Sequence, residues 1–300
     1  MQKKQIIFIV GPTASGKSAA AIRLAKKING EIVSADSMQI YKGLDILSAK
    51  PTKAQQKQVT HHLIDIIGPG RSFNVNTFVR LAAKAIEDIL ERGKVPIVVG
   101  GTGFYIDALL CGIFKGPAKN AALRNKLEKQ ARRYGNDYLH DKLKKVDPDA
   151  AKKIHPHDLR RTIRALEVYM ITKKPITQLQ KERQGLLDDP RYDIRIYGMA
   201  LSRQQLYENI DKRVDVMFRK GAASEVKRIM KDRLSKTFKQ ALGIKELAPY
   251  LSGETSLEEA KSSLQQNTRH FAKRQLTWFR RYGNIHWIKD LRQMSRVSAH

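Results

Sequence analysis

The sequence predicts an α/β fold, in which a parallel β-sheet carries helices on both faces and an all-helical insertion interrupts it. Two observations support this prediction. Over the first 115 residues, short apolar runs alternate with amphipathic segments, and each run is continuously apolar, as in strands that are covered on both faces. After residue 116 the chain becomes charged and helical in pattern, and a strand-like run returns only near residue 190.

The first elements are predicted from apolar patterning. We expect strands at Ile6–Val10, Glu31–Ala35, His62–Ile67 and Val95–Val99. Two helices between them are predicted from apolar residues that recur every three or four positions. The first spans Lys17–Ile28, and its inner side is Ala19, Ile22, Leu24 and Ala25. The second spans Asn74–Arg92, and its inner side is Phe78, Leu81, Ala82, Ala85 and Ile89.

The rest of the chain is predicted in the same way. A helix is expected at Asp158–Ile171, and its inner side is Leu159, Ile163, Leu166 and Met170. A strand at Tyr192–Ala200 is followed by helices around Arg203–Lys220, Ala222–Arg233 and Leu257–Tyr282, and by a short strand at Ile285–Ile288. We therefore expect a first core segment at 1–116, a helical insertion at 117–190, and a second core segment with basic C-terminal helices at 191–300.

Composition excludes several classes of protein. The chain has 300 residues, which favours two domains or one large domain with an insertion. Its longest apolar runs are far shorter than the roughly 20 residues that a membrane span needs. Cys111 is the only cysteine, so an intrachain disulfide and a cysteine-based zinc site are both excluded. These observations predict a protein of the reducing cytoplasm with no membrane span.

The net charge predicts a polyanionic partner. Lys and Arg number 57 and Asp and Glu 29, which gives +28. Residues 116–300 carry 41 basic and 21 acidic side chains, so most of the excess lies there. Nucleic acid is the first interpretation of such a charge. A solvated basic surface and an anionic membrane surface are the alternatives.

Residues 11–18 match the P-loop motif G-x-x-x-x-G-K-S/T between an apolar strand and a helix, which is the context that the motif requires. Backbone N–H groups of such a loop bind phosphate, the lysine adds positive charge, and the Ser18 hydroxyl can ligate Mg²⁺. The motif predicts a P-loop NTPase-like sheet and a polyphosphate ligand, but it does not identify ATP. The predicted phosphate-binding residues are Gly11, Pro12, Thr13, Ala14, Ser15, Gly16, Lys17 and Ser18.

Other candidates follow the predicted strands. Asp36 comes after the second strand, where a carboxylate could act as a base, bind a metal, accept from a substrate hydroxyl, or simply cap a turn. Thr102 lies in the glycine-rich segment after the strand at 95–99, which could equally be a plain turn. Asp65 is a candidate Walker B acid. The histidines at 61, 62, 155 and 157 match no zinc spacing.

Two helices carry basic residues beside apolar ones. Arg160, Arg161 and Arg164 share the helix at 158–171 and could contact phosphates or form a solvated face. The last long helix has Phe271 and Trp278 as expected core residues. Its basic residues, which could contact an RNA backbone or solvent, are Arg269, Lys273, Arg274, Arg280 and Arg281.

Together these motifs resemble the tRNA dimethylallyltransferases (tRNA isopentenyltransferases) of bacterial type. The matching segments span nearly the whole chain: GPTASGKS at 11–18, SADSMQIYKGLDI at 34–46, HHLID at 61–65, GGTGFYIDAL at 100–109, DLRRTIRALE at 158–167, RVDVMFRKG at 213–221, ALGIKE at 241–246 and TRHFAKRQLTWFRR at 268–281. Two features depart from relatives. Met38 stands where many members have Arg, and the zinc finger of some eukaryotic members has no counterpart.

The resemblance implies a reaction. Dimethylallyl diphosphate would bind in the P-loop with Mg²⁺, and N6 of the adenine 3′ of the anticodon, at tRNA position 37, would displace the diphosphate. Asp36 would be the base, Thr102 would touch the nucleotide or the donor, and Arg213 would hold the diphosphate. The partner would be a tRNA anticodon stem-loop bound by a monomer. Residues implied in tRNA contact are Asp36, Ser37, Met38, Gln39, Thr102, Arg124, Arg160, Arg161, Thr162, Ile163, Arg164, Gln240 and Gly243.

Three other functions share parts of this pattern. A small-molecule kinase would use the same P-loop but would not explain the basic second half of the chain. A prenyltransferase that acts on free AMP would share the chemistry without needing that charge. A nucleotide-switched RNA-binding module would need no base at Asp36.

Overall fold

The computed structural model describes residues 3–289, which form two compact units. The helical unit is Cys111–Asp188, and the core unit is the rest of the described chain. The sequence pattern places the insertion at 117–190, so the helical unit begins earlier than predicted. The core helix that precedes the insertion ends at Leu110, and the irregular stretch that follows it belongs to the helical unit.

Within the described residues, the core unit contains a six-stranded sheet whose strands are all parallel, in the order β3-β2-β4-β1-β5-β6. The strands are β1 (Lys4–Val10), β2 (Gly30–Ser34), β3 (His61–His62), β4 (Val95–Gly100), β5 (Tyr192–Met199) and β6 (His286–Ile288). Val10 pairs with both Gly100 and Gly198, so β1, β4 and β5 end at nearly the same position along the sheet. The loops after these strands therefore open at one edge of the sheet, where ligands of parallel sheets bind.

The predicted third strand is the one that differs from expectation. The pattern predicts His62–Ile67, but β3 is only His61–His62. Leu63 and Asp65 adopt positive φ angles of 63° and 57°, which end the extended conformation. Ile67 instead forms an isolated bridge with Tyr41.

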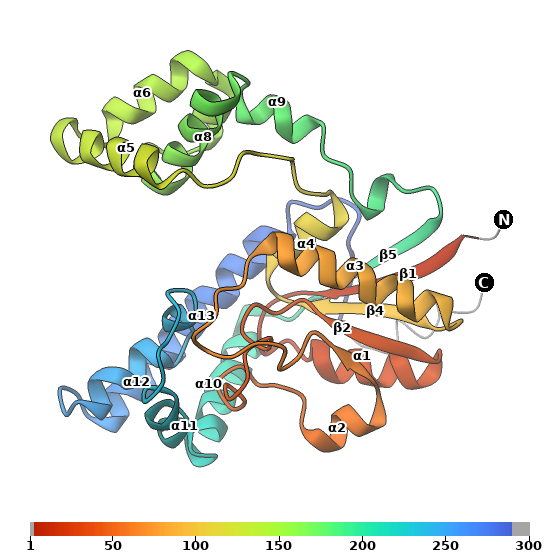
Figure 1. The fold of residues 1–300 in the computed structure, drawn as a ribbon. Helices are drawn as coiled ribbons and strands as arrows, with labels where there is room; N and C mark the ends of the chain where they lie inside the picture. Colours follow the sequence, from red (N-terminus) through yellow and green to blue (C-terminus); the bar gives the residue numbers. More distant parts are fainter. Residues whose placement is uncertain (1–2, 290–300) are drawn as a thin grey trace. The chain divides into compact units, whose positions relative to one another are not determined.

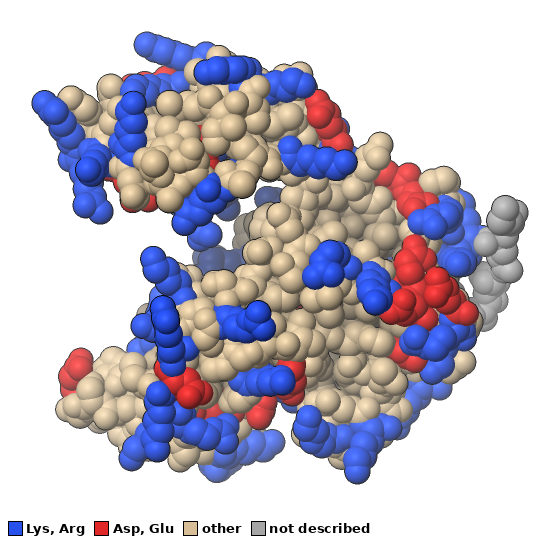
Figure 2. All heavy atoms as spheres, in the orientation of Figure 1, with Lys and Arg blue, Asp and Glu red and all other residues tan. Residues whose placement is uncertain are grey.

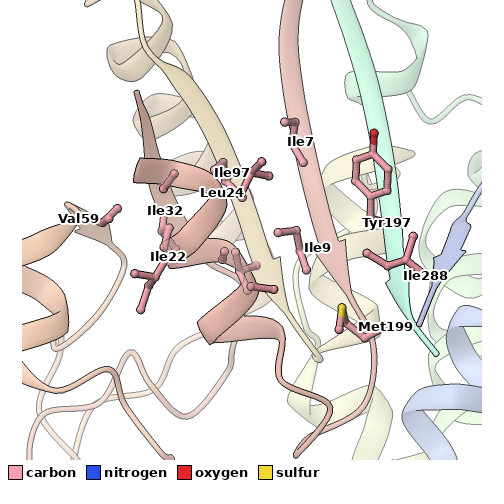
Figure 3. Close-up of a cluster of buried hydrophobic side chains, with 14 residues drawn as sticks. Ile7, Ile9, Ile22, Leu24, Ile32, Val59, Ile97, Tyr197, Met199 and Ile288 are labelled. Carbon is pink, nitrogen blue, oxygen red and sulfur yellow. The ribbon is translucent and has the colours of Figure 1, made fainter. Parts of the chain in front are cut away.

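Helices cover both faces of the sheet, as the sequence predicts (Figure 1). Helix α1 (Lys17–Lys27) packs on one face, where Ile22 and Leu24 belong to the same apolar cluster as the strand residues Ile9 and Ile97 (Figure 3). Helices α3 (Val75–Glu91) and α4 (Gly103–Leu110) lie on the other. The prediction for Ala19 is wrong. It is exposed, because the buried face of α1 is centred on its neighbours Ala20 and Ala21.

The remaining helices of the core unit are α2 (Lys53–Gln58), α10 (Arg203–Arg219), α11 (Ala222–Ile229), α12 (Ile244–Leu251) and α13 (Leu257–Phe279), with a short 3₁₀ turn at Phe238–Gln240. Serine capping boxes start α10 at Ser202 and α13 at Ser256. Helix α13 packs against α10 and α12, and Leu276 and Ala272 join Ile210 in one apolar cluster. This packing brings the C-terminal helices to the edge of the sheet at which the P-loop opens.

The helical unit contains α5 (Ala121–Tyr134), α6 (Asn136–Val146), α7 (Pro148–Lys153), α8 (Leu159–Thr172) and α9 (Ile176–Lys181), and it ends in a 3₁₀ turn at Leu186–Asp188. Its own apolar core includes Leu127, Leu139 and Leu166. The prediction that Met170 points inward is wrong, since 41% of its surface is exposed. Between residues 3 and 289, the structure has no helix with the length and hydropathy of a membrane span.

Candidate active site

The P-loop connects β1 to α1, and three of its residues adopt positive φ angles, which are rare for residues other than glycine. Gly11, Ala14 and Gly16 have φ angles of 139°, 61° and 87°. The first N–H groups of α1 have no partner within the helix, so they are free to donate to an anion. A non-glycine residue at positive φ, as at Ala14, is typical of functional loops.

Side chains from distant helices fix the loop in place. Gln275 of α13 accepts a hydrogen bond from Thr13 N at 2.8 Å and donates to Gly101 O at 2.8 Å. Arg213 of α10 donates to Thr13 Oγ1 at 3.1 Å. Asn209, one turn earlier on α10, donates to Ala14 O at 3.3 Å. The loop is thus held by α10 and α13, and Gln275 also ties it to the end of β4.

Two partly buried cations lie at this loop. Lys17 Nζ donates to Pro12 O at 2.5 Å. Burial, and then the nearby charge of Arg213, lower the pKa of Lys17 to about 7, while Asp36 acts in the opposite direction. Burial also lowers the pKa of Arg213, and Asp36 again opposes the shift. A site that disfavours its own positive charges in this way is suited to an anion that neutralises them.

Asp36 follows β2 and is oriented by a local turn. Its Oδ1 accepts from Met38 N at 2.8 Å and from Gln39 N at 3.4 Å. No described residue donates to Oδ2, so that oxygen can accept a proton from a ligand. At Gly100 a Cβ would lie 2.2 Å from Ala35 O, so only glycine allows β4 to end against the segment that carries Asp36.

Thr102 lies beside this segment. Its Oγ1 accepts from Ser37 N at 3.1 Å and is 3.4 Å from Ser37 Oγ. Thr102 N is also 3.4 Å from Ala35 O. The glycine-rich segment is therefore more than a plain turn, because its hydroxyl fixes the backbone that follows Asp36.

A cavity of about 590 Å³ joins these features. The predicted site residues that line it are Thr13, Lys17, Ser18, Asp36, Ser37, Met38, Gln39, Thr102, Arg213 and Gln240. Apolar side chains, among them Leu47, Met217 and Phe271, make up other parts of its lining. One cavity thus holds two cations, a carboxylate and an apolar surface.

Other candidates lie outside this lining. Gly243 is buried beside it, with φ of 95°, and a Cβ there would lie 2.4 Å from a methyl group of Leu47. Asp65 lies outside the cavity lining, and its carboxylate pairs with Lys50 at 2.5 Å. The proposed Walker B role of Asp65 is therefore wrong. The described residues also form no cluster of three or more His, Cys, Asp or Glu side chains that could hold a metal ion.

In the helical unit, several candidate residues serve the unit's own structure. Arg124 donates to both oxygens of buried Glu167, at 2.8 and 2.7 Å, and Arg164 donates at 2.6 Å. Burial would raise the pKa of Glu167, but these hydrogen bonds outweigh it and lower the pKa to about 2. Thr162 and Ile163 are also predicted to contact tRNA. Their side chains are 0% and 5% exposed and pack in the unit's core, so they have no surface for such a contact.

Arg160 and Arg161 of the same helix are exposed, and Arg161 pairs with Asp158 at 3.3 Å. Arg160 also lines a groove of the helical unit together with Arg124 and Arg132. On the face shown in Figure 2, Lys and Arg side chains are spread over both units. This basic surface is the structural counterpart of the net charge.

Sequence reasoning missed several cavity residues. Gln275 and Asn267 of α13 were not singled out, although both lie in the cavity lining. A usable signal existed for Gln275, which is a polar residue on the buried face of a helix, seven positions after Thr268 and four before Phe279. Phe271 was expected in the core, yet it is half-buried and lines the cavity.

Comparison with known families gives two matches. A family model described as IPP transferase matches residues 39–282, and one described as isopentenyl transferase matches residues 4–67. Together they cover both the P-loop and the C-terminal helices.

Individual proteins are similar over nearly the whole chain. The chain is 50% identical to the tRNA dimethylallyltransferase of Caldanaerobacter subterraneus over 95% of its length and 91% of that protein. It is 48% identical to that of Acetivibrio thermocellus over 94% and 91%. A crystal structure of a tRNA isopentenylpyrophosphate transferase from Bacillus halodurans superposes with a TM-score of 0.70 at 39% identity, covering 99% of this chain and 100% of that one. A eukaryotic dimethylallyltransferase captured acting on tRNA superposes with a TM-score of 0.80 at 31% identity, covering 99% and 77%.

Proposed function

The chain belongs to the IPP transferase family, and we propose that its cavity transfers a dimethylallyl group from dimethylallyl diphosphate to N6 of the adenosine at tRNA position 37. Transfer of a dimethylallyl group to tRNA follows from the family. The donor, the acceptor atom and the residue roles are the proposed part. The observation that supports them is the meeting of Lys17, Arg213 and Asp36 in one cavity.

The P-loop end of the cavity suits a diphosphate. The N–H groups of the loop and of the first turn of α1 can donate to its oxygens, and Lys17 and Arg213 supply charge. The leaving diphosphate gains negative charge as the carbon–oxygen bond breaks, so the same donors stabilise the transition state. None of these groups recognises a nucleobase, so ATP would at best compete for the phosphate subsite.

Asp36 is placed to serve the nucleophile. In the proposed step, N6 bonds to the allylic carbon, the carbon–oxygen bond to the diphosphate breaks, and one N6 proton passes to Oδ2 of Asp36. An exocyclic amine is a weak nucleophile, so a carboxylate that accepts its proton assists the attack. The two backbone N–H groups on Oδ1 hold the carboxylate in the orientation that this step requires.

The residues fit a magnesium ion. Mg²⁺ is usually held by one or two protein oxygens together with phosphates and water. The Ser18 hydroxyl lines the same cavity as the P-loop and could supply such an oxygen. When bound, the ion would offset part of the charge of the diphosphate.

The tRNA would be bound through its backbone by basic side chains. Exposed Arg160 and Arg161 belong to the helical unit, and the chain as a whole carries a net charge of +28. We propose the anticodon stem-loop as the bound region, because a loop base is unstacked at lower cost than a base in a duplex. We also propose that the enzyme acts as a monomer in the cytoplasm, where tRNA is found.

Label transfer tests this function directly. The protein is incubated with Mg²⁺, tRNA and either dimethylallyl diphosphate labelled in the dimethylallyl group or γ-labelled ATP. Label should reach the tRNA only from the prenyl donor, and nucleoside mass spectrometry should show N6-(dimethylallyl)adenosine. A tRNA with guanosine at position 37 should accept no label. Transfer from ATP alone would identify a kinase and overturn the proposal.

A further inference from the structure

One wall of the cavity is built by a segment without regular secondary structure. Residues 43–50, here called the wall loop, contribute Leu44, Leu47, Ser48 and Ala49 to the cavity lining. Ala49 has a positive φ of 46°. Since no helix or strand holds these residues, the shape of the wall depends on contacts from elsewhere in the fold.

The strongest of these contacts comes from Glu225 of α11. Its Oε2 accepts from Asp45 N and Ile46 N, both at 2.8 Å, and its Oε1 accepts from Leu47 N at 3.1 Å. Only 5% of the residue is exposed. A buried carboxylate that accepts three consecutive backbone N–H groups, 178 to 180 positions away in the chain, fixes the wall loop at its centre.

The wall loop in turn holds Gln39, which lies three residues after Asp36. Gln39 Nε2 donates to Ser48 O at 3.3 Å and lies 3.4 Å from Ala49 O. Ser34 Oγ donates to Gln39 Oε1 at 2.9 Å. The orientation of Gln39 thus depends on the two carbonyls that immediately follow the N–H groups bound by Glu225.

The wall loop has a second set of anchors. Lys50 Nζ pairs with Asp45 at 2.6 Å and with Asp65 at 2.5 Å, and it donates to Tyr41 O at 2.7 Å. Arg228 donates to Gly43 O at 3.3 Å. Because these contacts do not involve Glu225, the segment should stay folded when the side chain of Glu225 is changed.

We propose that Glu225 is a positioning residue for the acceptor: it sets the wall loop, and through Gln39 the segment beside Asp36, in the shape that receives the tRNA nucleotide. The inference rests on the proposed function, which places the diphosphate at the P-loop. No residue of the wall loop belongs to the P-loop, so a displaced wall should impair the acceptor and spare the donor.

Separate measurements of the two substrates test the inference. In Glu225→Gln, one oxygen becomes an NH₂ group that faces a backbone N–H, so at least one of the three hydrogen bonds is lost. Loss of one such bond predicts a tRNA KM about 5- to 10-fold higher. The KM for dimethylallyl diphosphate should stay within about twofold of the wild-type value. In Glu225→Asp, which keeps the charge but shortens the side chain, the tRNA KM should be intermediate.

The matched control is Asp45→Asn. It alters the side-chain pairing of the same loop with Lys50, while the backbone N–H groups remain on Glu225. Neither KM should change in this variant, and both variants should unfold within a few degrees of the wild type in thermal scans. An unchanged tRNA KM in Glu225→Gln, or an equal rise in both KM values, would overturn the inference. If the wild-type protein transfers no dimethylallyl group, the proposed function itself fails, which is a separate outcome.

Discussion

The core unit holds Lys17 and Arg213 in its cavity with lowered pKa values, whereas the helical unit surrounds buried Glu167 with Arg124 and Arg164. Among the described residues, these two cations donate to neutral oxygens: Lys17 to Pro12 O and Arg213 to Thr13 Oγ1. In the helical unit, the hydrogen bonds to Glu167 raise the pKa of Arg124.

This difference separates two uses of arginine and lysine that composition cannot distinguish. A cation that meets a buried carboxylate contributes to the fold, because each charge offsets the cost of burying the other. A desolvated cation without such a partner costs stability and is typical of a binding site. Changes in the cavity should therefore affect catalysis, and changes at Glu167 should affect stability.

The largest effect is expected at Asp36 of the core unit. Asp36→Asn should slow single-turnover transfer by about 10²–10⁴, the usual range for a lost general base, and leave tRNA binding nearly intact. Rapid-quench measurement with enzyme in excess over tRNA gives the rate, and filter binding gives the affinity. A single-turnover rate near the wild-type value would remove Asp36 from the mechanism.

Arg213 tests the cavity cations directly. Arg213→Met should lower kcat by about 10²–10³, since one donor to the leaving diphosphate is lost. The free energy of unfolding should stay within about 1 kcal/mol of the wild type, because a desolvated charge is removed. The control is Arg92→Met in the same unit, where the guanidinium pairs with Glu31 at 2.6 Å. That variant should keep its rate. An equal loss of unfolding free energy in Arg213→Met and Arg92→Met would contradict the distinction between cavity cations and cations that pair with a buried carboxylate.

Glu167 tests the other half of the comparison. Its pKa is lowered from 4.5 to about 2, so it stabilises the folded unit fully above pH 4.5 and loses that effect as the pH falls toward 2. A shift of this size corresponds to about 3 kcal/mol. Hydrogen-exchange protection factors of α5 and α8, which correct for the pH dependence of free amides, should fall over this pH range, whereas in Glu167→Gln they should already be low at neutral pH.

The core unit supplies the control for that measurement. Both tryptophans of the chain, Trp278 and Trp287, belong to the core unit, so their fluorescence reports on it and not on the helical unit. As the pH falls, the protection factors of α5 and α8 should therefore drop before the tryptophan signal changes. If the two signals change together at every pH, Glu167 is not a separate determinant of the helical unit.

The sequence predicted the sheet and the position of the P-loop because these depend on local patterns. Continuous apolar runs mark the strands β1 and β4, and the spacing of glycine and lysine marks the loop. The errors at Ala19 and Met170 have a simple origin. Each residue of a helix turns the side chain by about 100°, so an error of one position moves a residue off the buried face.

The supporting residues of the site could not be predicted in this way. Gln275 and Glu225 act on segments more than 170 positions away, and such pairs leave no local pattern. The helical position of Gln275 indicates that it is buried, whereas Glu225 lies in a short helix with several charges, which favours a solvent-exposed interpretation. Only the tertiary fold shows that both residues bond to the backbone of the cavity.

The smallest effect is expected at the exposed arginines of the helical unit, which belong to neither class of buried cation. If the protein neutralises about 5 phosphates, log K for tRNA should fall with log[salt] at a slope of about −3.5 to −4.5. Arg160→Ala should weaken binding a few-fold and make this slope shallower by about 0.7–0.9, the share of one phosphate contact. Lys26→Ala, which removes an exposed charge from α1 outside the cavity lining, should leave the slope unchanged. Fluorescence anisotropy between about 50 and 200 mM salt resolves these slopes. Equal slopes for wild type and Arg160→Ala would mean that Arg160 is solvated surface and contacts no phosphate of the tRNA.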